Sequence, residues 1–257
     1  MTLNQNFIAF KTLVTKEVLR FARIWVQTIV PAMITTALYF VIFGNLIGGR
    51  IGDMGGFRYV DYIVPGLILM SVITNSYANT VSSFYSSKFQ RNIEEMLISP
   101  MSNSVILLGY IGGGVMRGLS VGVAVTIVAM VFTHFHLHNV WVSFSIVVLT
   151  AILFSIAGII NAIYANSFDD ISIIPTFVLT PLTYLGGIFY TISLLPEFWQ
   201  KVSLINPILY MVNAFRYGFL GVTDINILHS YVIICGFIAG LYLFSLHLLN
   251  KGHGIRS

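Results

Sequence analysis

The strongest constraint on how this chain folds is its shortage of charged residues. Only 9% of its 257 residues are Asp, Glu, Lys or Arg, whereas 57% are hydrophobic and the mean hydropathy is +0.88. A soluble domain usually carries about 25% charged residues. The sequence therefore predicts an all-α integral membrane protein, with residues 1–257 forming a single transmembrane domain.

Six apolar runs are long enough to cross a bilayer, which takes about 20 residues in a helix. A seventh apolar stretch, 191–221, is interrupted by prolines and charges, and we expect short re-entrant or interfacial helices there, between the fifth and sixth spans. The six predicted transmembrane helices are Ile24–Gly48, Val60–Ser83, Val105–Phe132, Val140–Ala165, Ile171–Tyr190 and Tyr231–Leu249.

The positive charges predict the orientation, because Lys and Arg resist translocation. With both termini in the cytoplasm, more of these residues lie inside than outside. The bias also accounts for most of the net charge of +4, so no nucleic-acid partner is needed to explain it. The inner residues would be Lys11, Lys16, Arg20, Arg23, Lys88, Arg91, Lys251 and Arg256, and the outer ones Arg50, Arg58, Lys201 and Arg216.

Residues 1–23 have the pattern of an amphipathic helix at the membrane interface. Apolar residues fall on one helical face, and basic residues fall nearly opposite. Such a helix either only anchors the protein in the membrane lipids or also touches a cytoplasmic partner. The apolar residues are Phe7, Phe10, Val14, Val18 and Phe21, and the basic ones are Lys16, Arg20 and Arg23.

The second and fifth spans each carry a polar stripe at helical spacing. Such stripes either line a polar path or bond across helices, where each contact contributes about 0.6–2 kcal/mol. Pro181 predicts a kink in the fifth span, because proline lacks a backbone donor. The stripes are Ser71, Asn75, Asn79 and Ser82 in the second span, and Thr176, Thr180, Thr183 and Tyr184 in the fifth.

The third span contains a ridge of small residues. Gly114, Gly118 and Gly122 form two overlapping G-x-x-x-G units, a pattern that lets helix backbones approach closely. We expect this ridge to serve helix packing. Arg117 lies within it, and so it either faces protein or water or extends to the cytoplasmic headgroups.

The sequence lacks the motifs that usually indicate a catalytic site. The sequence has no H-E-x-x-H, no G-x-S-x-G and no phosphate-binding G-x-x-x-x-G-K-[ST]. The single Cys235 excludes an intrachain disulfide and a cysteine-based zinc site. Three histidines, His134, His136 and His138, are weak evidence for a surface metal site, because no carboxylate accompanies them.

The loop between the second and third spans, residues 86–100, is the most unusual polar segment. It carries charges of both signs, and Pro100 marks its end. Its apolar residues recur at helical spacing, which predicts a short helix that docks on a partner outside the bilayer. These apolar residues are Phe89, Ile93, Met96 and Leu97.

The chain also contains a set of motifs in its second half, in addition to the stretch Phe89–Glu95. They are the run Leu179–Tyr190, the pairs Leu195-Pro196 and Asn206-Pro207, and Tyr210 and Arg216. Together with the amphipathic N-terminal helix and the six spans, these motifs resemble the type-2 permeases of ATP-binding-cassette exporters, most closely their YadH-like branch. The resemblance covers nearly the whole chain.

The resemblance implies a permease subunit of the bacterial inner membrane that is not itself an enzyme. A separate nucleotide-binding ATPase subunit would bind ATP and Mg²⁺, and two permease copies would complete the transport path. The first cytoplasmic loop would be the coupling helix, with contacts at Phe89, Gln90, Arg91, Glu94 and Glu95. Transport would proceed by alternating access or lateral extrusion of a lipid, a lipid-linked glycan or an amphipathic drug. An ATP-independent channel and an intramembrane enzyme are the competing classes.

Overall fold

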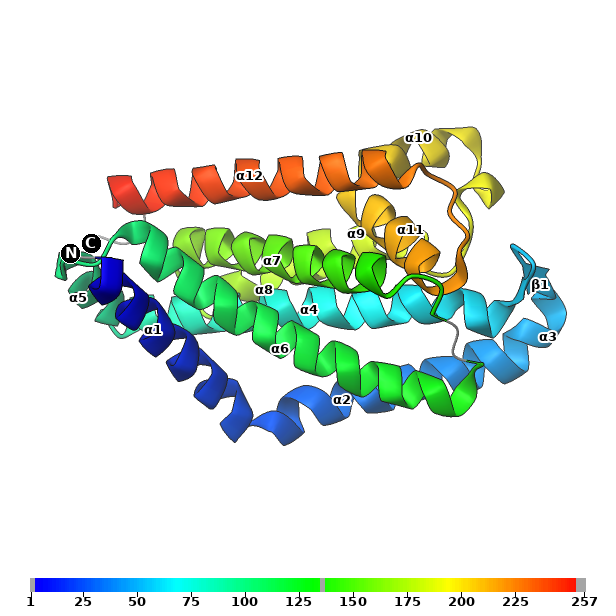
Figure 1. Ribbon diagram of the computed structural model, residues 1–257, viewed down its shortest axis with the longest axis horizontal. Helices are drawn as coiled ribbons and strands as arrows, with labels where there is room; N and C mark the ends of the chain where they lie inside the picture. The colour runs from blue at the N-terminus through cyan, green and yellow to red at the C-terminus, as the bar shows by residue number, and fades with distance from the viewer. Residues whose placement is uncertain (1–2, 135–136, 253–257) are drawn as a thin grey trace.

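The structure is a computed structural model that describes residues 3–134 and 137–252 (Figure 1). Almost all of this part of the chain is helical. Within the described residues, five helical stretches are long and apolar enough to cross a membrane, which supports the predicted all-α membrane protein. They are Trp25–Ile51, α4 (Tyr59–Phe89), α6 (Asn103–Phe132), α7 (Val140–Tyr164) and α12 (Ile227–Lys251).

The first of these stretches is not uniform along its length. The helix α1 (Leu3–Arg23) leads into α2 (Trp25–Tyr39), which continues as the π-helical stretch η1 (Phe40–Ile47) and the short α3 (Gly48–Ile51). A small antiparallel hairpin, β1 (Asp53–Met54) and β2 (Phe57–Arg58), then returns the chain into α4.

The elements predicted to be cytoplasmic gather at one end of the molecule. The start of α1, the helix α5 (Asn92–Ile98) and the end of α12 lie together at the left of Figure 1, whereas β1, α3 and α10 (Glu197–Ile205) lie at the opposite end. The side chain of Asn103 donates a hydrogen bond to Asn250 Oδ1 at 2.7 Å and ties α6 to α12 at that end.

The fifth predicted span, Ile171–Tyr190, does not form a helix of full length. It consists of α8 (Asp170–Ile174), the π-helical turn η2 (Pro175–Leu179) and α9 (Thr180–Tyr184), with five residues in each. Pro175 begins η2 and Pro181 is the second residue of α9, and proline has no backbone N–H to donate. We predicted a kink at Pro181, and the structure has a π-helical turn just before this residue. Six full-length spans are therefore not confirmed.

The stretch predicted to be re-entrant contains two short helices after the turn η3 (Ile192–Leu194). The first is α10, and the second is α11 (Pro207–Leu220), which packs against α4, α7 and α12. Arg216 of α11 is 1% exposed and lies over the ring of Tyr62 at 3.9 Å. It also donates a hydrogen bond to the Gly187 carbonyl at 2.5 Å, which fixes α11 to the turn after α9.

The helix α4 is the centre of the packed core. Its apolar side chains are buried against α6, α7 and α11, and α12 covers α7 from the other side. The helices α2 and α12, in contrast, present exposed apolar residues along their outer surfaces, as expected for helices that face lipid.

Candidate functional site

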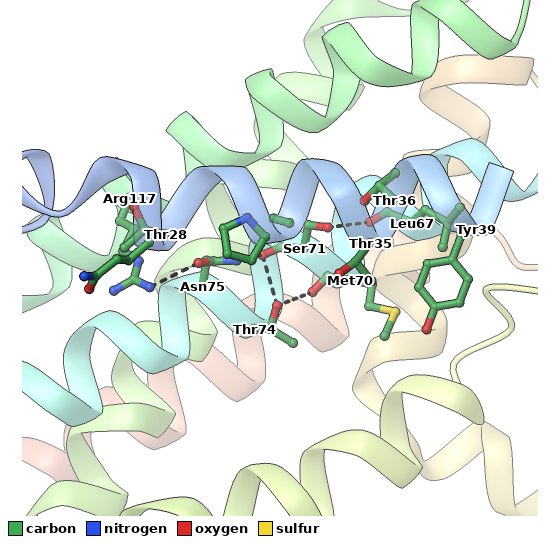
Figure 2. Close-up of a pocket in the computed structure, with 13 residues that line it drawn as sticks. Thr28, Thr35, Thr36, Tyr39, Leu67, Met70, Ser71, Thr74, Asn75 and Arg117 are labelled. Atoms are coloured by element: carbon green, nitrogen blue, oxygen red, sulfur yellow. Dashed lines mark hydrogen bonds between the residues drawn. The ribbon is translucent and has the colours of Figure 1, made fainter. Parts of the chain in front are cut away.

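A polar groove lies between α2 and α4 (Figure 2). Its volume is about 270 Å³. Hydroxyl and amide groups from both helices line it together with one arginine from α6. The lining residues are Gln27, Thr28, Pro31, Ala32, Thr35, Thr36, Tyr39, Leu67, Met70, Ser71, Thr74, Asn75 and Arg117.

Arg117 supplies the only charge among the residues that line this groove. It is fourteen residues from Asn103, the start of α6, or about 21 Å along the helix. Its Nη2 donates a hydrogen bond to Asn75 Oδ1 at 3.2 Å, whereas its Nε is buried without a partner. Of the two interpretations of Arg117, the structure therefore favours a side chain directed at protein and the groove.

The polar stripe of the second span divides between two environments. Ser71 and Asn75 line the groove, whereas Asn79 is fully buried beneath α1. Arg20 of α1 donates to the backbone oxygen of Asn79 at 3.0 Å and to its Oδ1 at 2.8 Å. The same arginine pairs with the buried Glu17 at 3.2 Å. Asn79 thus holds α1 in place and does not face the groove.

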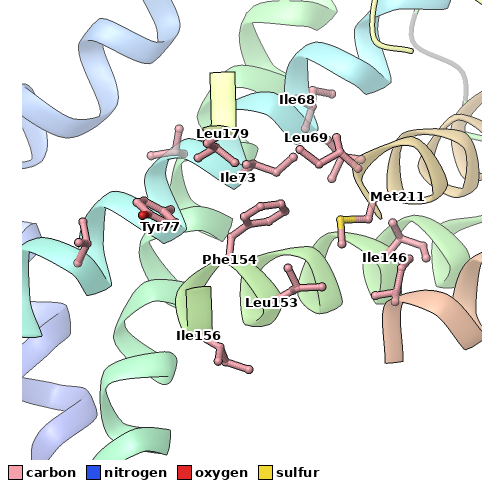
Figure 3. Packing of buried hydrophobic residues seen from close by; sticks show 14 of the residues in the cluster. Ile68, Leu69, Ile73, Tyr77, Ile146, Leu153, Phe154, Ile156, Leu179 and Met211 are labelled. Atoms are coloured by element: carbon pink, nitrogen blue, oxygen red, sulfur yellow. The ribbon is translucent and has the colours of Figure 1, made fainter. Parts of the chain in front are cut away.

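The side of α4 toward α6 and α7 is tightly packed, and Figure 3 shows Ile73 and Tyr77 of α4 beside Phe154 of α7. The predicted glycine ridge of α6 lies on this side of α4. A Cβ at Gly118 would meet Ser76 Oγ at 1.9 Å, one at Gly114 would meet Thr80 Cγ2 at 2.7 Å, and one at Gly122 would meet Val72 Cγ2 at 2.9 Å. The ridge therefore faces α4 of the same chain, and Gly114 also faces Ser155 of α7, whose Oγ a Cβ would meet at 2.3 Å. Sequence reasoning missed Gly158 of α7, whose Cβ would lie 2.7 Å from the Tyr77 carbonyl oxygen.

The polar stripe of the fifth predicted span lies mainly on an exposed surface. Thr176, Thr180 and Tyr184 are exposed in the single chain, whereas Thr183 is buried. The hydroxyl groups of Thr176 and Thr180 donate to the backbone oxygens of Ser172 and Pro175, one turn earlier in the chain, at 2.8 and 2.9 Å. The stripe does not line the groove between α2 and α4, but Tyr184 approaches its edge, because the ring of Phe189 packs against both Tyr184 and the groove-lining Tyr39.

The loop between α4 and α6 forms a second candidate site, at the end of the molecule that carries α5. Lys88 donates hydrogen bonds to the carbonyl oxygens of Ile163 and Ala165, each at 2.7 Å, and so joins the end of α4 to the end of α7. Arg91 then adopts a left-handed conformation with φ of 63°, which turns the chain into α5. Gln90, Arg91 and Glu95 are exposed, and Glu94 is half-buried.

The apolar residues of this loop do not all face outward as predicted. Ile93 is fully buried, and Met96 and Leu97 pack against the core of the same chain. Phe89 remains 66% exposed and stacks edge-on against Phe168, with ring centroids 5.2 Å apart.

Two further exposed apolar residues extend this surface. Phe168, in the loop before α8, is 51% exposed, and Ile98 at the end of α5 is 86% exposed. Sequence reasoning did not select either residue, although Phe168 stands between the polar residues Ser167 and Asp169. Backbone and side-chain hydrogen bonds from Asn166 and Ser167 shape the loop before α8, and they lower the pKa of Asp170.

The histidine cluster does not form a metal site among the described residues. No group of three His, Cys, Asp or Glu side chains is close enough there to hold a metal ion. The ring of His138 packs edge-on against Tyr217 at 5.4 Å, whereas His136 lies outside the described residues.

A second cavity, of about 430 Å³, lies between α6, α7 and α11 and has an almost entirely apolar lining. It contains Leu119, Val123, Phe144, Val147 and Phe215 but no charged residue. Such a surface can take an acyl chain but offers no means of selecting a head group.

Comparison with known proteins decides the family. The sequence pattern described as "ABC-2 type transporter" matches residues 8–220. The chain belongs to the ABC-2 type transporter family. It is also 56% identical over 98% of both chains to "Inner membrane transport permease YadH" of Escherichia coli K12, and 23% identical over 83% of both chains to "Nodulation protein J" of Rhizobium leguminosarum bv. viciae.

Membership of the ABC-2 family accounts for the composition of the chain and for the missing nucleotide-binding motif. The chain is a multi-pass transport permease of the inner membrane type, and the family implies partnership with an ATPase subunit.

Proposed function

We propose that this ABC-2 protein is the permease subunit of an ATP-driven exporter and works as a homodimer with two copies of a separate ATPase subunit. Both termini would lie in the cytoplasm. The observation that carries this proposal is the mixed surface around α5, which combines exposed charges with exposed apolar side chains at the end where α1 begins and α12 ends. We call the residues Phe89, Gln90, Arg91, Glu94, Glu95, Ile98 and Phe168 the docking surface.

The docking surface has the chemistry of a contact with a water-soluble partner. Phe89, Phe168 and Ile98 supply apolar area, and Arg91 and Glu95 supply charges of opposite sign that select a complementary groove. Because Lys88 joins the end of α4 to the end of α7, a displacement of α5 would be transmitted to both of these long helices. ATP-driven closure of the ATPase subunits would then move α4, which lines the polar groove.

The transport path in this proposal uses the groove beside α4 and the exposed stripe of Thr176, Thr180 and Tyr184. In a single chain these two surfaces meet at Phe189, between Tyr39 and Tyr184, and the exposed side of the stripe is left for a second copy to cover. The mixed polar and apolar lining suits an amphiphile such as a lipid, a lipid-linked glycan or an amphipathic drug, moved by alternating access or lateral extrusion.

The test is a double charge reversal on the docking surface. Arg91→Glu with Glu95→Lys should lower co-purification of the ATPase subunit of the same transport system about tenfold or more, because like charges then oppose across the contact. The permease itself should insert and purify normally, since both side chains are exposed.

The matched control reverses an exposed pair at the other end of the molecule. Glu197 and Lys201 pair at 2.7 Å on α10, and swapping them preserves both charge and pairing. This variant should bind the ATPase subunit as the wild type does. Equal binding by both double variants would show that α5 is not the ATPase contact.

A further inference from the structure

The groove between α2 and α4 contains a positive charge that the chain itself does not neutralise. Among the described residues, the ion pairs are Arg20–Glu17, Arg58–Asp61 and Lys201–Glu197, and Arg117 belongs to none of them. The buried carboxylate of Glu17 is already paired with Arg20. A cation near the middle of a membrane helix is costly without an anion or water beside it.

The free donor of Arg117 indicates the kind of ligand that would neutralise it. One nitrogen is engaged by Asn75, and the buried Nε has no partner. A guanidinium presents its donors as a planar fork that matches the oxygens of a phosphate or carboxylate. The nearby hydroxyl groups of Ser71 and Thr74 already donate to backbone oxygens of α4, whereas Arg117 is the charged donor among the residues that line the groove.

The position of the groove indicates that the anion is carried by an amphiphile. Its lining mixes hydroxyl groups with the apolar surfaces of Pro31, Ala32 and Met70. Next to it, the outer surface of α2 exposes Ile34 and Leu38, which face lipid in a membrane. An acyl chain can therefore lie along α2 while its head group reaches Arg117 (Figure 2).

We propose that the groove between α2 and α4 binds the anionic head group of a membrane amphiphile through Arg117, with Asn75 orienting the guanidinium. This names a ligand class for the groove of the exporter proposed above and so rests on that function. Binding is measured without the ATPase subunit, so its failure is distinguishable from a failure of the docking surface.

The experiment measures lipid binding to the purified permease by native mass spectrometry. The probes are phosphatidylglycerol and phosphatidylcholine with identical acyl chains, dodecyl phosphate, and inorganic phosphate. We expect phosphatidylglycerol or dodecyl phosphate to bind about tenfold more tightly than phosphatidylcholine, and Arg117→Gln to abolish this preference. Arg50→Gln, which removes an exposed arginine of α3 at the end of the molecule away from α5, should leave it unchanged.

A second variant distinguishes a loss of lipid binding from a loss of folding, which Arg117→Gln alone does not. Asn75→Asp places a carboxylate beside Arg117, where it neutralises the charge from within. It should retain or raise the melting temperature and yet lose the preference for anionic amphiphiles. If Arg117 were only structural, Asn75→Asp would leave lipid binding as it is.

The probes also separate the possible sources of the anion. Preference for phosphatidylglycerol that depends on Arg117 supports a bilayer lipid, and preference for dodecyl phosphate alone supports a different amphiphile with the same head-group chemistry. Inorganic phosphate that binds as tightly as dodecyl phosphate would contradict an amphiphile site. Binding that is independent of Arg117 with every probe would overturn the proposal.

Discussion

The two sides of α4 carry similar polar residues, but these residues are packed against neighbouring helices on one side and line a groove on the other. On the side toward α6 and α7, Ser76 and Thr80 are fully buried against Gly118 and Gly158, at distances that leave no room for a side chain. On the side toward α2, Ser71 and Asn75 line a groove of about 270 Å³. A polar residue in a membrane helix therefore indicates a site only where the neighbouring helix stands away from it.

The largest expected effect on stability comes from adding a side chain where α7 packs closely against α4. In Gly158→Leu, the new side chain would meet the backbone of α4 at Tyr77 and Val81, which cannot shift cheaply. Overpacking usually costs about 1–3 kcal/mol, and we expect a value at or above the upper limit. Thermal unfolding of the purified permease measures the loss of stability.

The control for this variant is Gly236→Leu on α12, because a Cβ at Gly236 has no atom within 4 Å. Its melting temperature should match that of the wild type. If both variants were equally stable, the close approach of α7 to α4 would not be a determinant of the fold.

Sequence periodicity predicted much, but not all, of this difference between the two sides of α4. Apolar runs and glycine spacing predicted the long helices and the ridge at Gly114, Gly118 and Gly122, because both depend on local pattern. The direction of that ridge, toward α4, depends on helix rotation in three dimensions. Gly158 has no matching glycine four residues away, so the G-x-x-x-G pattern does not select it.

The candidate sites show the same limit of sequence reasoning. Spacing placed Asn75 and Asn79 on one helical face, but it could not show that α1 covers only the second of them. It also assigned Ile93 to a partner, because amphipathic periodicity does not distinguish a helix that packs on its own chain from one that packs on another. Phe168 joins the docking surface from a distant loop, which no local pattern reveals.

A smaller effect should separate the two asparagines by stability. Asn79→Leu removes the acceptor Oδ1 from Arg20, and hydrogen bonds to charged groups contribute roughly 1.5–3 kcal/mol. Asn75→Leu removes one longer bond beside a groove and should cost less than about 1 kcal/mol. Denaturation of the two variants side by side measures this difference, and a larger loss for Asn75→Leu would reverse our assignment of the two environments.

The smallest effect is a difference in chemical accessibility along α4. In a variant with the exposed Cys235 replaced by serine, a cysteine at position 75 should react with a small water-soluble maleimide faster than one at position 79, because Asn75 lines the groove and Asn79 is fully buried. Ile127→Cys, on the exposed apolar surface of α6, is the control for a position that faces lipid, where the reagent does not dissolve. Trapping ATP in the complex should change the rate at position 75 if α4 moves with α5. Equal rates at positions 75 and 127, with or without nucleotide, would mean that the groove holds no water and cannot be part of a polar path.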